Sequence, residues 1–553
     1  MNLSTIDIAI VAIYAVGLLS IALWVSREPA GETKNTEDYF LAGKSLPWWA
    51  IGASLIAANI SAEQIIGQSG QGFVVGLAIA AYEWQAAVVL LIVAAFFLPI
   101  FLKRGIYTMP QFLETRFGDS VKSVMAVFWI FLFTAVNLTT VLYGGALAIK
   151  AVTGLAIFPG MAMLAIFALL YSLYGGLKAV ALTDIIQVVI LILGGFAITI
   201  LVLGMVGDGA GPVAGFKTLT SELPGHFEMI LSRDHPQYGN LPGIWTLLGG
   251  LWVLHFSYWG FNQYIIQRAL GAESLPEAQR GLAFAALLKF LIPLIVVIPG
   301  IGALWMAQQG MLDMATLDPA TCKTVDGAQV CGKPDSTYGV LMALMPVGVR
   351  GLIFAALIAA IVSSLASMIN SISTIFTMDI YRDYISKART EKHYVMIGRI
   401  TAGVAMVIAL ILAIPLLGGG TSIFQTIQEY TGFVAPGIVA VFVLGFFWKR
   451  GKTPPRRICF CISRRLCFRF CLSSVLRSRG RREPGIAEPR SGRVSGFMGS
   501  GFNPDLSGLA DFNVTTNAVV VAAFCSYSCS ALVVGGCRFL RLTQDPPRPD
   551  QTA

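Results

Sequence analysis

Long apolar stretches recur along the chain from its beginning to Trp448, and short polar connections separate them. A helix needs about 20 mainly apolar residues to cross roughly 30 Å of hydrocarbon. Eleven windows reach that length, namely Ile6 to Val25, Pro47 to Gly70, Phe73 to Phe101, Val121 to Ile149, Ala156 to Tyr174, Ala179 to Val206, Gly243 to Gln267, Gly281 to Met306, Val349 to Ile380, Val395 to Leu416 and Thr421 to Trp448. The pattern predicts an all-α polytopic membrane protein.

Two of these windows are interrupted by polar and glycine residues near their centres. The stretches are 54–70 and 252–267, and they lie five windows apart. Interrupted segments at matching positions of two halves indicate an inverted-repeat transporter with a site near the bilayer midplane. We therefore expect a leading helix at 6–25, repeat one at 47–206 and repeat two at 243–448. Each repeat has an odd number of spans, so the two are inverted.

The amino-acid composition is that of a membrane protein, and it differs between residues 1–452 and residues 453–553. Apolar residues make up 56% of the chain and charged residues only 12%, which excludes disorder and an ordinary soluble enzyme. The net charge is +9, but residues 1–452 carry 25 Lys and Arg against 24 Asp and Glu. The basic excess therefore belongs to residues 453–553, with 14 Arg, no Lys and six acids, and it does not indicate nucleic-acid binding.

The segment 453–553 is also rich in cysteine, with seven between Cys459 and Cys537. A shifted reading frame explains so abrupt a change of composition best. A basic segment at the membrane surface and a metal-binding cysteine cluster are the alternatives. One apolar run, 518–536, is long enough to insert into a membrane. The predicted transmembrane core is thus residues 1–452.

Basic connections predict the orientation. Clusters at 103–122, 382–399 and 449–452 all fall on the cytoplasmic side if the N-terminus is outside, as the positive-inside rule requires. The same count places the connection 307–348 in the periplasm. Cys322 and Cys331 lie in it, and we expect them to form a disulfide in that oxidising compartment. Two free thiols are the alternative.

Ionisable and amide side chains inside apolar spans indicate a binding site. Close helix packing explains the many small residues, but it does not explain Glu63, Gln64, Glu83, His255 or Lys289. Such convergent donors and acceptors suit a ligand rich in hydroxyl groups. Nearby aromatic residues are candidates for packing on the ligand or gating, or for ordinary helix packing; they are Tyr82, Tyr258 and Phe424.

A hard cation instead needs oxygen ligands. Ser363 and Ser364 offer two hydroxyl groups, which we expect to face the interrupted stretch 57–60. Serine hydroxyl groups often bond to their own helix instead. Asp184 is a further acid inside a span, and it is either an ion-exit group or an interfacial residue at a helix start.

Four motifs together resemble the sodium:solute symporter family, over about residues 6–452. They are Tyr39-Phe-Leu-Ala-Gly-Lys-Ser-Leu-Pro-Trp-Trp49, Ser54-Leu-Ile-Ala-Ala-Asn-Ile-Ser-Ala-Glu-Gln64, Trp259-Gly-Phe-Asn-Gln-Tyr-Ile-Ile-Gln-Arg268 and Ala360-Ile-Val-Ser-Ser-Leu-Ala-Ser-Met368. The resemblance implies a leucine-transporter-like five-plus-five fold with an extra N-terminal helix. It also implies sodium-driven uptake of a monosaccharide, galactose or glucose, by alternating access.

The resemblance also assigns roles to single residues. It implies that sugar hydroxyl groups bind to Gln64, Glu83, Asn137, Lys289 and Gln428. Tyr258 would stack on the sugar as the inner gate, held by Asn59, while Tyr82 and Phe424 match outer-gate aromatics. The sodium ligands would be the carbonyl groups of Ala57, Ile60 and Ala360 and the hydroxyl groups of Ser363 and Ser364, with Asp184 on the release route.

Three positions depart from the family's sugar site. His255 replaces an Asn, Ala86 replaces a Ser, and Gln68 replaces an outer-gate Met. A lost hydroxyl partner costs on the order of 1 kcal/mol. These changes leave sugar binding intact in principle but leave the preferred hexose open, whereas the sodium positions match fully.

The predicted protein is therefore a transporter of the bacterial inner membrane, not an enzyme. Its expected partners are a monosaccharide, sodium as co-substrate and the lipid bilayer, with no cofactor and no nucleic acid. A sodium symporter for an amino acid or carboxylate, and a transporter-like sugar sensor, are the alternatives. The sequence does not determine the oligomeric state or the ratio of sodium to sugar.

Overall fold

The computed structural model describes residues 3–27, 34–235, 237–238, 241, 243–317, 322–325, 328–417 and 423–448. The segment 453–553, with its apolar run 518–536, lies outside these residues. Seven described helices are long and apolar enough to cross a membrane, and one bent pair makes an eighth candidate. The other predicted windows correspond to the shorter apolar helices Ile157–Leu170 and Val434–Phe447 and to an interrupted segment that begins at Gly243.

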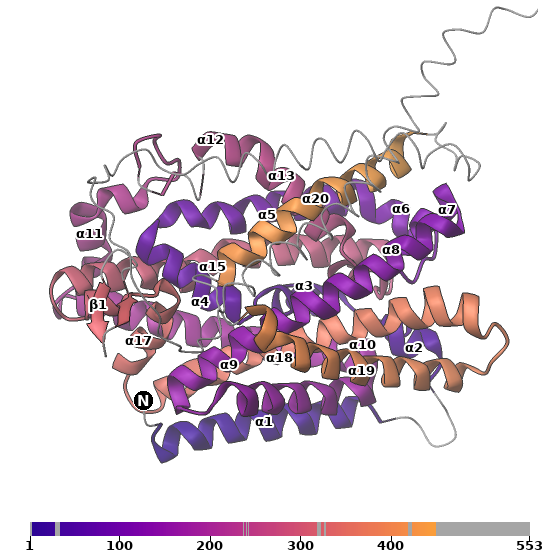
Figure 1. Ribbon diagram of the computed structural model, residues 1–553, viewed down its shortest axis with the longest axis horizontal. Coiled ribbons are helices and arrows are strands. Elements are labelled where there is room, and N and C mark those ends of the chain that lie inside the picture. Colours follow the sequence, from indigo (N-terminus) through magenta and orange to yellow (C-terminus); the bar gives the residue numbers. More distant parts are fainter. Residues whose placement is uncertain are drawn as a thin grey trace, which may run out of the picture. The chain divides into compact units, whose positions relative to one another are not determined.

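The first half of the core begins with a peripheral helix and continues through Val206 (Figure 1). Its elements are α1 (Thr5–Val25), α2 (Thr36–Leu41), η1 (Ala42–Lys44), α3 (Trp48–Asn59), α4 (Ala62–Val74), η2 (Leu77–Ala80), α5 (Ala81–Ile92), η3 (Val93–Phe97), α6 (Leu98–Lys103), α7 (Met109–Phe117), α8 (Asp119–Phe131), η4 (Leu132–Leu138), α9 (Thr139–Thr153) and α10 (Ile157–Val206).

Connecting elements and the second half follow. These elements are α11 (Pro212–Glu222), η5 (Pro224–Phe227), α12 (Gly243–Trp245), η6 (Thr246–Gly250), α13 (Leu251–His255), η7 (Phe256–Gly260), α14 (Gln263–Leu270), α15 (Leu275–Gln308), α16 (Met314–Leu317), β1 (Cys322–Val325), β2 (Ala328–Cys331), η8 (Pro334–Ser336), α17 (Thr337–Leu344), α18 (Val349–Ile375), η9 (Phe376–Ile385), α19 (Glu391–Leu417) and α20 (Ile423–Phe447).

Both interrupted stretches contain a real break in the helix. Between α3 and α4, Ile60 and Ser61 adopt extended backbone angles, and the two helices are bent by 67°. In the second half, Asn262 is extended between η7 and α14, and its side chain accepts a hydrogen bond from the Tyr264 amide. A side-chain cap of this kind stabilises a new helix start. The polar interruptions in the sequence therefore mark the two breaks.

Glycine residues allow the helices around these breaks to approach closely. Gly72 of α4 lies against Gly300 and Val297 of α15, and an added Cβ at Gly300 would stand 2.1 Å from the Ser69 carbonyl oxygen. Gly176 bends α10 at a φ of +62°, a conformation that only glycine adopts readily. Helices α3, α4, α15 and α18 meet in the middle of Figure 1, and α3 packs against α10, α15 and α18.

Helix α1 is held to the start of α18 by a buried carboxylate. Asp7 accepts hydrogen bonds from the backbone amides of Gly348, at 2.8 Å, and Gly351, at 2.9 Å. Its other oxygen caps α1 by accepting from Ser4. Negative charge at a helix N-terminus is favourable because the free amides and the helix dipole both attract it. The leading helix is thus attached to the helix that carries Ser363 and Ser364.

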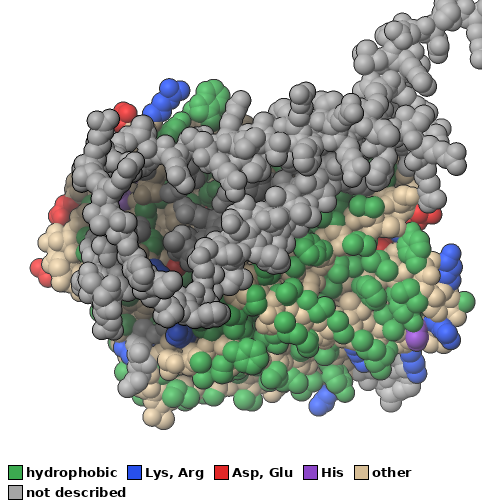
Figure 2. Space-filling model, viewed as in Figure 1, with side chains coloured by type: hydrophobic (Ala, Val, Ile, Leu, Met, Phe, Trp, Pro, Cys, Tyr) green, Lys and Arg blue, Asp and Glu red, His purple; other side chains and the backbone are tan. Residues whose placement is uncertain are grey.

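Apolar side chains cover the outer surface of the helices. Exposed examples are Ile13 and Trp24 on α1, Val127 on α8 and Ile411 on α19, and Figure 2 shows hydrophobic side chains gathered over this face. A contiguous apolar surface of this kind belongs in lipid. The chain is a multi-pass membrane protein.

The described strands form one small antiparallel hairpin in the connection between α15 and α18. Cys322 and Cys331 are paired residues in its register. The side chains of both cysteines lie outside the described part of the structure, so the disulfide stays a prediction.

Candidate functional site

Two groups of polar side chains contact α3 and the break that follows it. Ser54 and Asn59 stand five residues apart on α3, which corresponds to about 7 Å along a helix axis. Ser54 contacts a group that includes Asp184, and Asn59 contacts a group that includes Glu83. Ser54 lies within α3, and Asn59 is its last residue before the break at Ile60. The Asp184 group and the Glu83 group therefore contact different parts of the same helix.

Glu83 is the centre of the first group, and it is 1% exposed. One carboxylate oxygen accepts from Gln64 at 2.6 Å and from Gln68 at 2.7 Å. The other accepts from the ammonium group of Lys289, which also donates to the Asn59 side-chain oxygen. Breaking such a buried pair by removing one partner is strongly destabilising, because an uncompensated charge remains. The three donors thus satisfy both oxygens of this buried carboxylate.

Three buried side-chain atoms in or near this group have no hydrogen-bond partner among the described residues. They are Oε1 of Gln68, Oε2 of Glu63 and Nε2 of His255. Buried polar atoms are normally paired, so these atoms have unused capacity for hydroxyl groups, which both donate and accept. The ring of Tyr82 stands edge-on to that of His255, with centroids 6.4 Å apart.

Tyr258 connects this group to the second broken helix. Its hydroxyl accepts from the Asn59 amide at 3.0 Å and bonds to the hydroxyl of Tyr264 on α14. The neighbouring Trp259 ring lies 4.8 Å from the Lys289 ammonium nitrogen, a cation–π distance. The two breaks are therefore joined through the contact between Asn59 and Tyr258.

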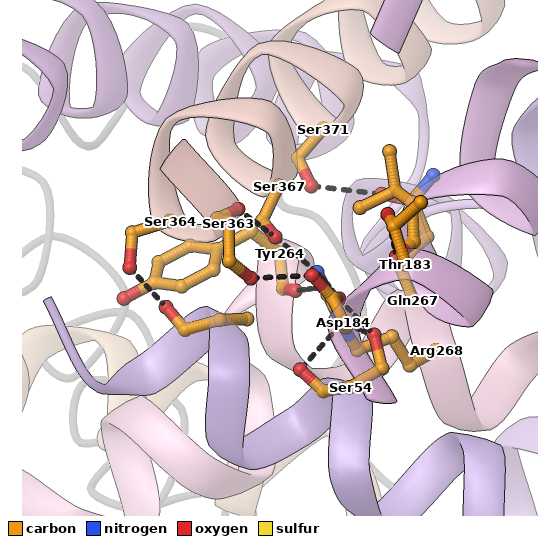
Figure 3. Close-up of polar contacts among 12 residues, drawn as sticks. Ser54, Thr183, Asp184, Tyr264, Gln267, Arg268, Ser363, Ser364, Ser367 and Ser371 are labelled. Carbon is orange, nitrogen blue, oxygen red and sulfur yellow. Dashed lines mark hydrogen bonds and ion pairs between the residues drawn. The ribbon is translucent and has the colours of Figure 1, made fainter. Parts of the chain in front are cut away.

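Ser363 and Ser364, which are adjacent on α18, donate hydrogen bonds to different partners (Figure 3). Ser364 donates to the carbonyl oxygens of Ala58, at 3.1 Å, and Ile60, at 3.3 Å, at the end of α3. Ser363 donates to Asp184 at 2.5 Å. Hydroxyl and carbonyl oxygens are the ligands that a hard cation takes. Of the other residues predicted as sodium ligands, Ile60 contributes one of these carbonyl groups, and Ala57 and Ala360 are buried on the same two helices.

Asp184 lies inside α10, fully buried, and it is not at a helix start. Besides Ser363 it accepts from Ser54 at 2.5 Å, and its Oδ2 is 3.6 Å from a guanidinium nitrogen of Arg268. Arg268 also donates to Ser54 and to Ser367 (Figure 3). Asp184 is therefore part of a buried polar group, and it follows the bend of α10 at Gly176.

The remaining predicted residues lie around these groups or beyond the described part. Asn137 is half-buried in η4 and Gln428 is half-buried in α20, and neither takes part in the hydrogen bonds given above. Ala86 is buried on α5, three residues after Glu83. The side chain of Phe424 lies outside the described part of the structure.

Sequence reasoning did not assign roles to Ser54, Trp259, Tyr264 or Arg268. Three of them fall in the motif 259–268, and Ser54 begins the motif 54–64. The signal that was available is Arg268 itself, which directly follows the apolar window 243–267, since an arginine at membrane depth needs an acid as partner. Pairing Asp184 with Arg268 and Glu83 with Lys289 leaves each pair electrically neutral.

A multi-pass membrane protein with two broken helices and buried polar groups at their junction has the architecture of a secondary transporter of the inverted-repeat class. The family model for the sodium:solute symporter family matches residues 39–454. The chain belongs to this family. Its relatives are cotransporters, which confirms the expectation that the chain is not an enzyme.

Several relatives are similar over most of the chain. A sodium/glucose cotransporter of Vibrio parahaemolyticus is 55% identical over 449 residues, covering 81% of this chain and 82% of the relative. Sodium/glucose cotransporter 4 of Danio rerio is 35% identical, covering 81% and 69%. Sodium/myo-inositol cotransporter 2 of Oryctolagus cuniculus is 34% identical, covering 81% and 67%.

A solved structure supports the fold. It is described as the substrate-bound outward-open state of a Na⁺-coupled sialic acid symporter, and it superposes with a TM-score of 0.70 at 20% identity. The match covers 96% of this chain and 98% of that one. The predicted leucine-transporter-like architecture is thereby confirmed.

Proposed function

We propose that this chain couples the inward movement of sodium to the uptake of a monosaccharide, galactose or glucose, by alternating access. The observation that carries the proposal is the junction of the two broken helices. There Asn59 contacts both Lys289 and Tyr258, while Ser364 contacts the carbonyl groups one residue away. The 55% identity to a sodium/glucose cotransporter supports the solute class.

The sugar site is proposed to be the Glu83 group. Gln64, Glu83 and Lys289 present an amide, a carboxylate and an ammonium group, which together match the mixed donors and acceptors of a hexose. Tyr258 would close the inner side, and Tyr82 and Phe424 the outer side, with Asn137 and Gln428 as further hydroxyl partners. His255 faces the group with one unpartnered nitrogen, and we assign it to a hydroxyl of the sugar.

The sodium site is proposed to lie between α18 and the end of α3. Its ligands would be the hydroxyl groups of Ser363 and Ser364 and the carbonyl groups of Ile60, Ala57 and Ala360. Asp184, which accepts from Ser363, would attract the ion onto its release route. Sodium binding would favour the form in which the sugar site is assembled, because a ligand shifts an equilibrium toward the state that it binds better.

The proposed location is the bacterial inner membrane with the N-terminus in the periplasm. Lys122 at the start of α8 is paired with Asp383 of η9, so two of the basic connections lie at the same end of the helices. The N-terminal Asp7 contacts Gly348, close to the connection that carries Cys322 and Cys331. Basic connections at one end and the N-terminus at the other fit the positive-inside rule.

The test is solute uptake into proteoliposomes that contain the purified full chain. Galactose, glucose, myo-inositol, proline and sialic acid are offered with an inward sodium gradient or with potassium in its place. We expect sodium-dependent uptake of galactose or glucose and none of proline. Sodium-dependent uptake of an amino acid or carboxylate alone would contradict the proposed solute class.

A further inference from the structure

We propose that Arg268 is a tethered cation that competes with sodium for the carboxylate of Asp184 and thereby sets the sodium affinity of the transporter. The inference rests on the proposed function, because it takes the Ser363–Ser364 region as the sodium site. It adds a residue of α14, outside that ligand set, as a determinant of how tightly the ion is held.

The first argument is the geometry of the pair. Asp184 is 0% exposed and Arg268 is 1% exposed, and their nearest charged atoms are 3.6 Å apart. Ser54 lies between them, accepting from the guanidinium at 2.7 Å and donating to the carboxylate at 2.5 Å. The Ser54 hydroxyl group therefore bridges the pair beside the ion pair at Oδ2. A cation at the Ser363 side would approach the other carboxylate oxygen, Oδ1.

The second argument is the position of the other carboxylate oxygen. Oδ1 of Asp184 accepts from Ser363, whose neighbour Ser364 contacts the carbonyl groups at the break of α3. Figure 3 shows Asp184 between the guanidinium and the two serines. A cation beside the serines and the cation of Arg268 thus share one acid.

The third argument is that the guanidinium keeps its charge. Arginine does not lose its proton in proteins, so sodium entering beside Ser363 meets a second positive charge in a medium of low dielectric constant. Like charges held close in such a medium repel strongly. Arg268 therefore lowers sodium affinity, while Asp184 raises it.

The position of Arg268 also ties this competition to the gate. Arg268 follows the second break on α14, and its guanidinium donates to the carbonyl of Tyr264, whose hydroxyl contacts Tyr258. Movement of α14 would carry the guanidinium and the proposed inner gate together. Release of sodium and of the sugar would then share one moving helix.

The experiment measures equilibrium binding of ²²Na⁺ to the purified full chain in detergent without sugar. The variants are Arg268→Gln, Asp184→Asn and the double variant. Competition predicts that Arg268→Gln tightens sodium binding by roughly threefold or more, because a repelling charge is removed. Asp184→Asn weakens binding by about as much, and adding Arg268→Gln to it restores affinity toward the wild type.

A merely structural arginine gives a different pattern. In that case Arg268→Gln leaves sodium affinity unchanged or weakens it, and the double variant binds no better than Asp184→Asn. Either result overturns the proposal. If Arg268→Gln alone does not fold, the comparison of Asp184→Asn with the neutral double variant decides, because competition requires tighter binding in the double variant.

The control is Arg280→Gln on α15. Arg280 is exposed and pairs only with Glu277 of its own helix among the described residues. This variant should leave sodium affinity unchanged. Absence of sodium binding in the wild type would contradict the proposed function itself, whereas normal wild-type binding without tightening in Arg268→Gln would contradict only the present inference.

Discussion

Single residues in this molecule distinguish the proposed ion site from the proposed sugar site. Ser364 contacts the carbonyl groups of Ala58 and Ile60, while Lys289 pairs with Glu83 and contacts the side chain of Asn59. Since the two groups meet at Asn59 but use different atoms, substitutions should affect them separately.

Replacing Ser364 by Ala should weaken the sodium dependence of uptake. The half-saturating sodium concentration should rise about fivefold, which corresponds to the loss of one oxygen ligand worth about 1 kcal/mol. Sugar affinity at saturating sodium should change little. The measurement is initial uptake against sodium concentration in vesicles.

The matched control for that variant is Ser373→Ala on the same helix. Ser373 is equally buried, but its hydroxyl donates to the Gly398 carbonyl at 2.8 Å. It should leave the sodium curve unchanged. Equal sodium curves for Ser364→Ala and the wild type would speak strongly against the proposed ion site.

Replacing Gln64 by Ala should weaken sugar binding and spare sodium binding. Gln64 donates to Glu83 and is half-buried, so its loss removes one amide beside the proposed sugar position. Sugar affinity should fall about fivefold. Titration calorimetry with galactose at saturating sodium measures this, and an unchanged affinity would remove Gln64 from the site.

His255→Asn should change the preference between hexoses. The imidazole of His255 is buried, with one nitrogen unpartnered among the described residues, and a shorter amide reaches different hydroxyl groups. The ratio of galactose to glucose affinity should shift by roughly threefold or more. Competition uptake with both sugars gives this ratio, and a constant ratio would mean that His255 does not contact the sugar.

At the level of elements, the two helix breaks were predictable and several of their contacts were not. Runs of amide, acid and glycine residues in otherwise apolar windows indicated where α3 and the η7–α14 segment are interrupted. The sequence could not indicate that Ser54 would bridge Asp184 and Arg268, because that contact joins α3, α10 and α14, which are far apart in the chain. It also could not indicate that the Ser364 hydroxyl would contact the Ala58 carbonyl, because that contact depends on how α3 and α18 pack.

The contact between α4 and α15 gives a prediction at this scale. Gly300→Ala should destabilise the protein by about 1–3 kcal/mol, because the added methyl group overlaps the Ser69 carbonyl. It should also weaken sugar binding, since α15 carries Lys289. Thermal unfolding in detergent measures the first effect. Gly403→Ala on α19, where an added Cβ meets nothing within 4 Å, should not lower the melting temperature.

At the level of the whole molecule, the sequence was sufficient for the membrane class and the family. The apolar windows and basic connections each extend over many residues. A wrong interpretation of one residue therefore does not change the predicted spans. The packing of Asn137, Gln428 and the outer gate depends on contacts that no local pattern encodes.

The orientation gives a prediction for the intact membrane. In spheroplasts, a membrane-impermeant maleimide should label Cys322 and Cys331 from the outside, and only after reduction. The additional labelling after reduction should be absent in the Cys322→Ser, Cys331→Ser double variant. This control shows that the label is not on the other cysteines. Labelling at these positions only after the membrane is permeabilised would reverse the proposed topology.

The most direct test of the account is reciprocal coupling in one vesicle preparation. With an inward sodium gradient, radiolabelled galactose or glucose should accumulate above its external concentration, and the same sugar should accelerate the entry of ²²Na⁺. Equal sugar uptake in sodium and in potassium, or sodium entry that does not respond to sugar, would contradict the claim that the two broken helices bind both substrates together.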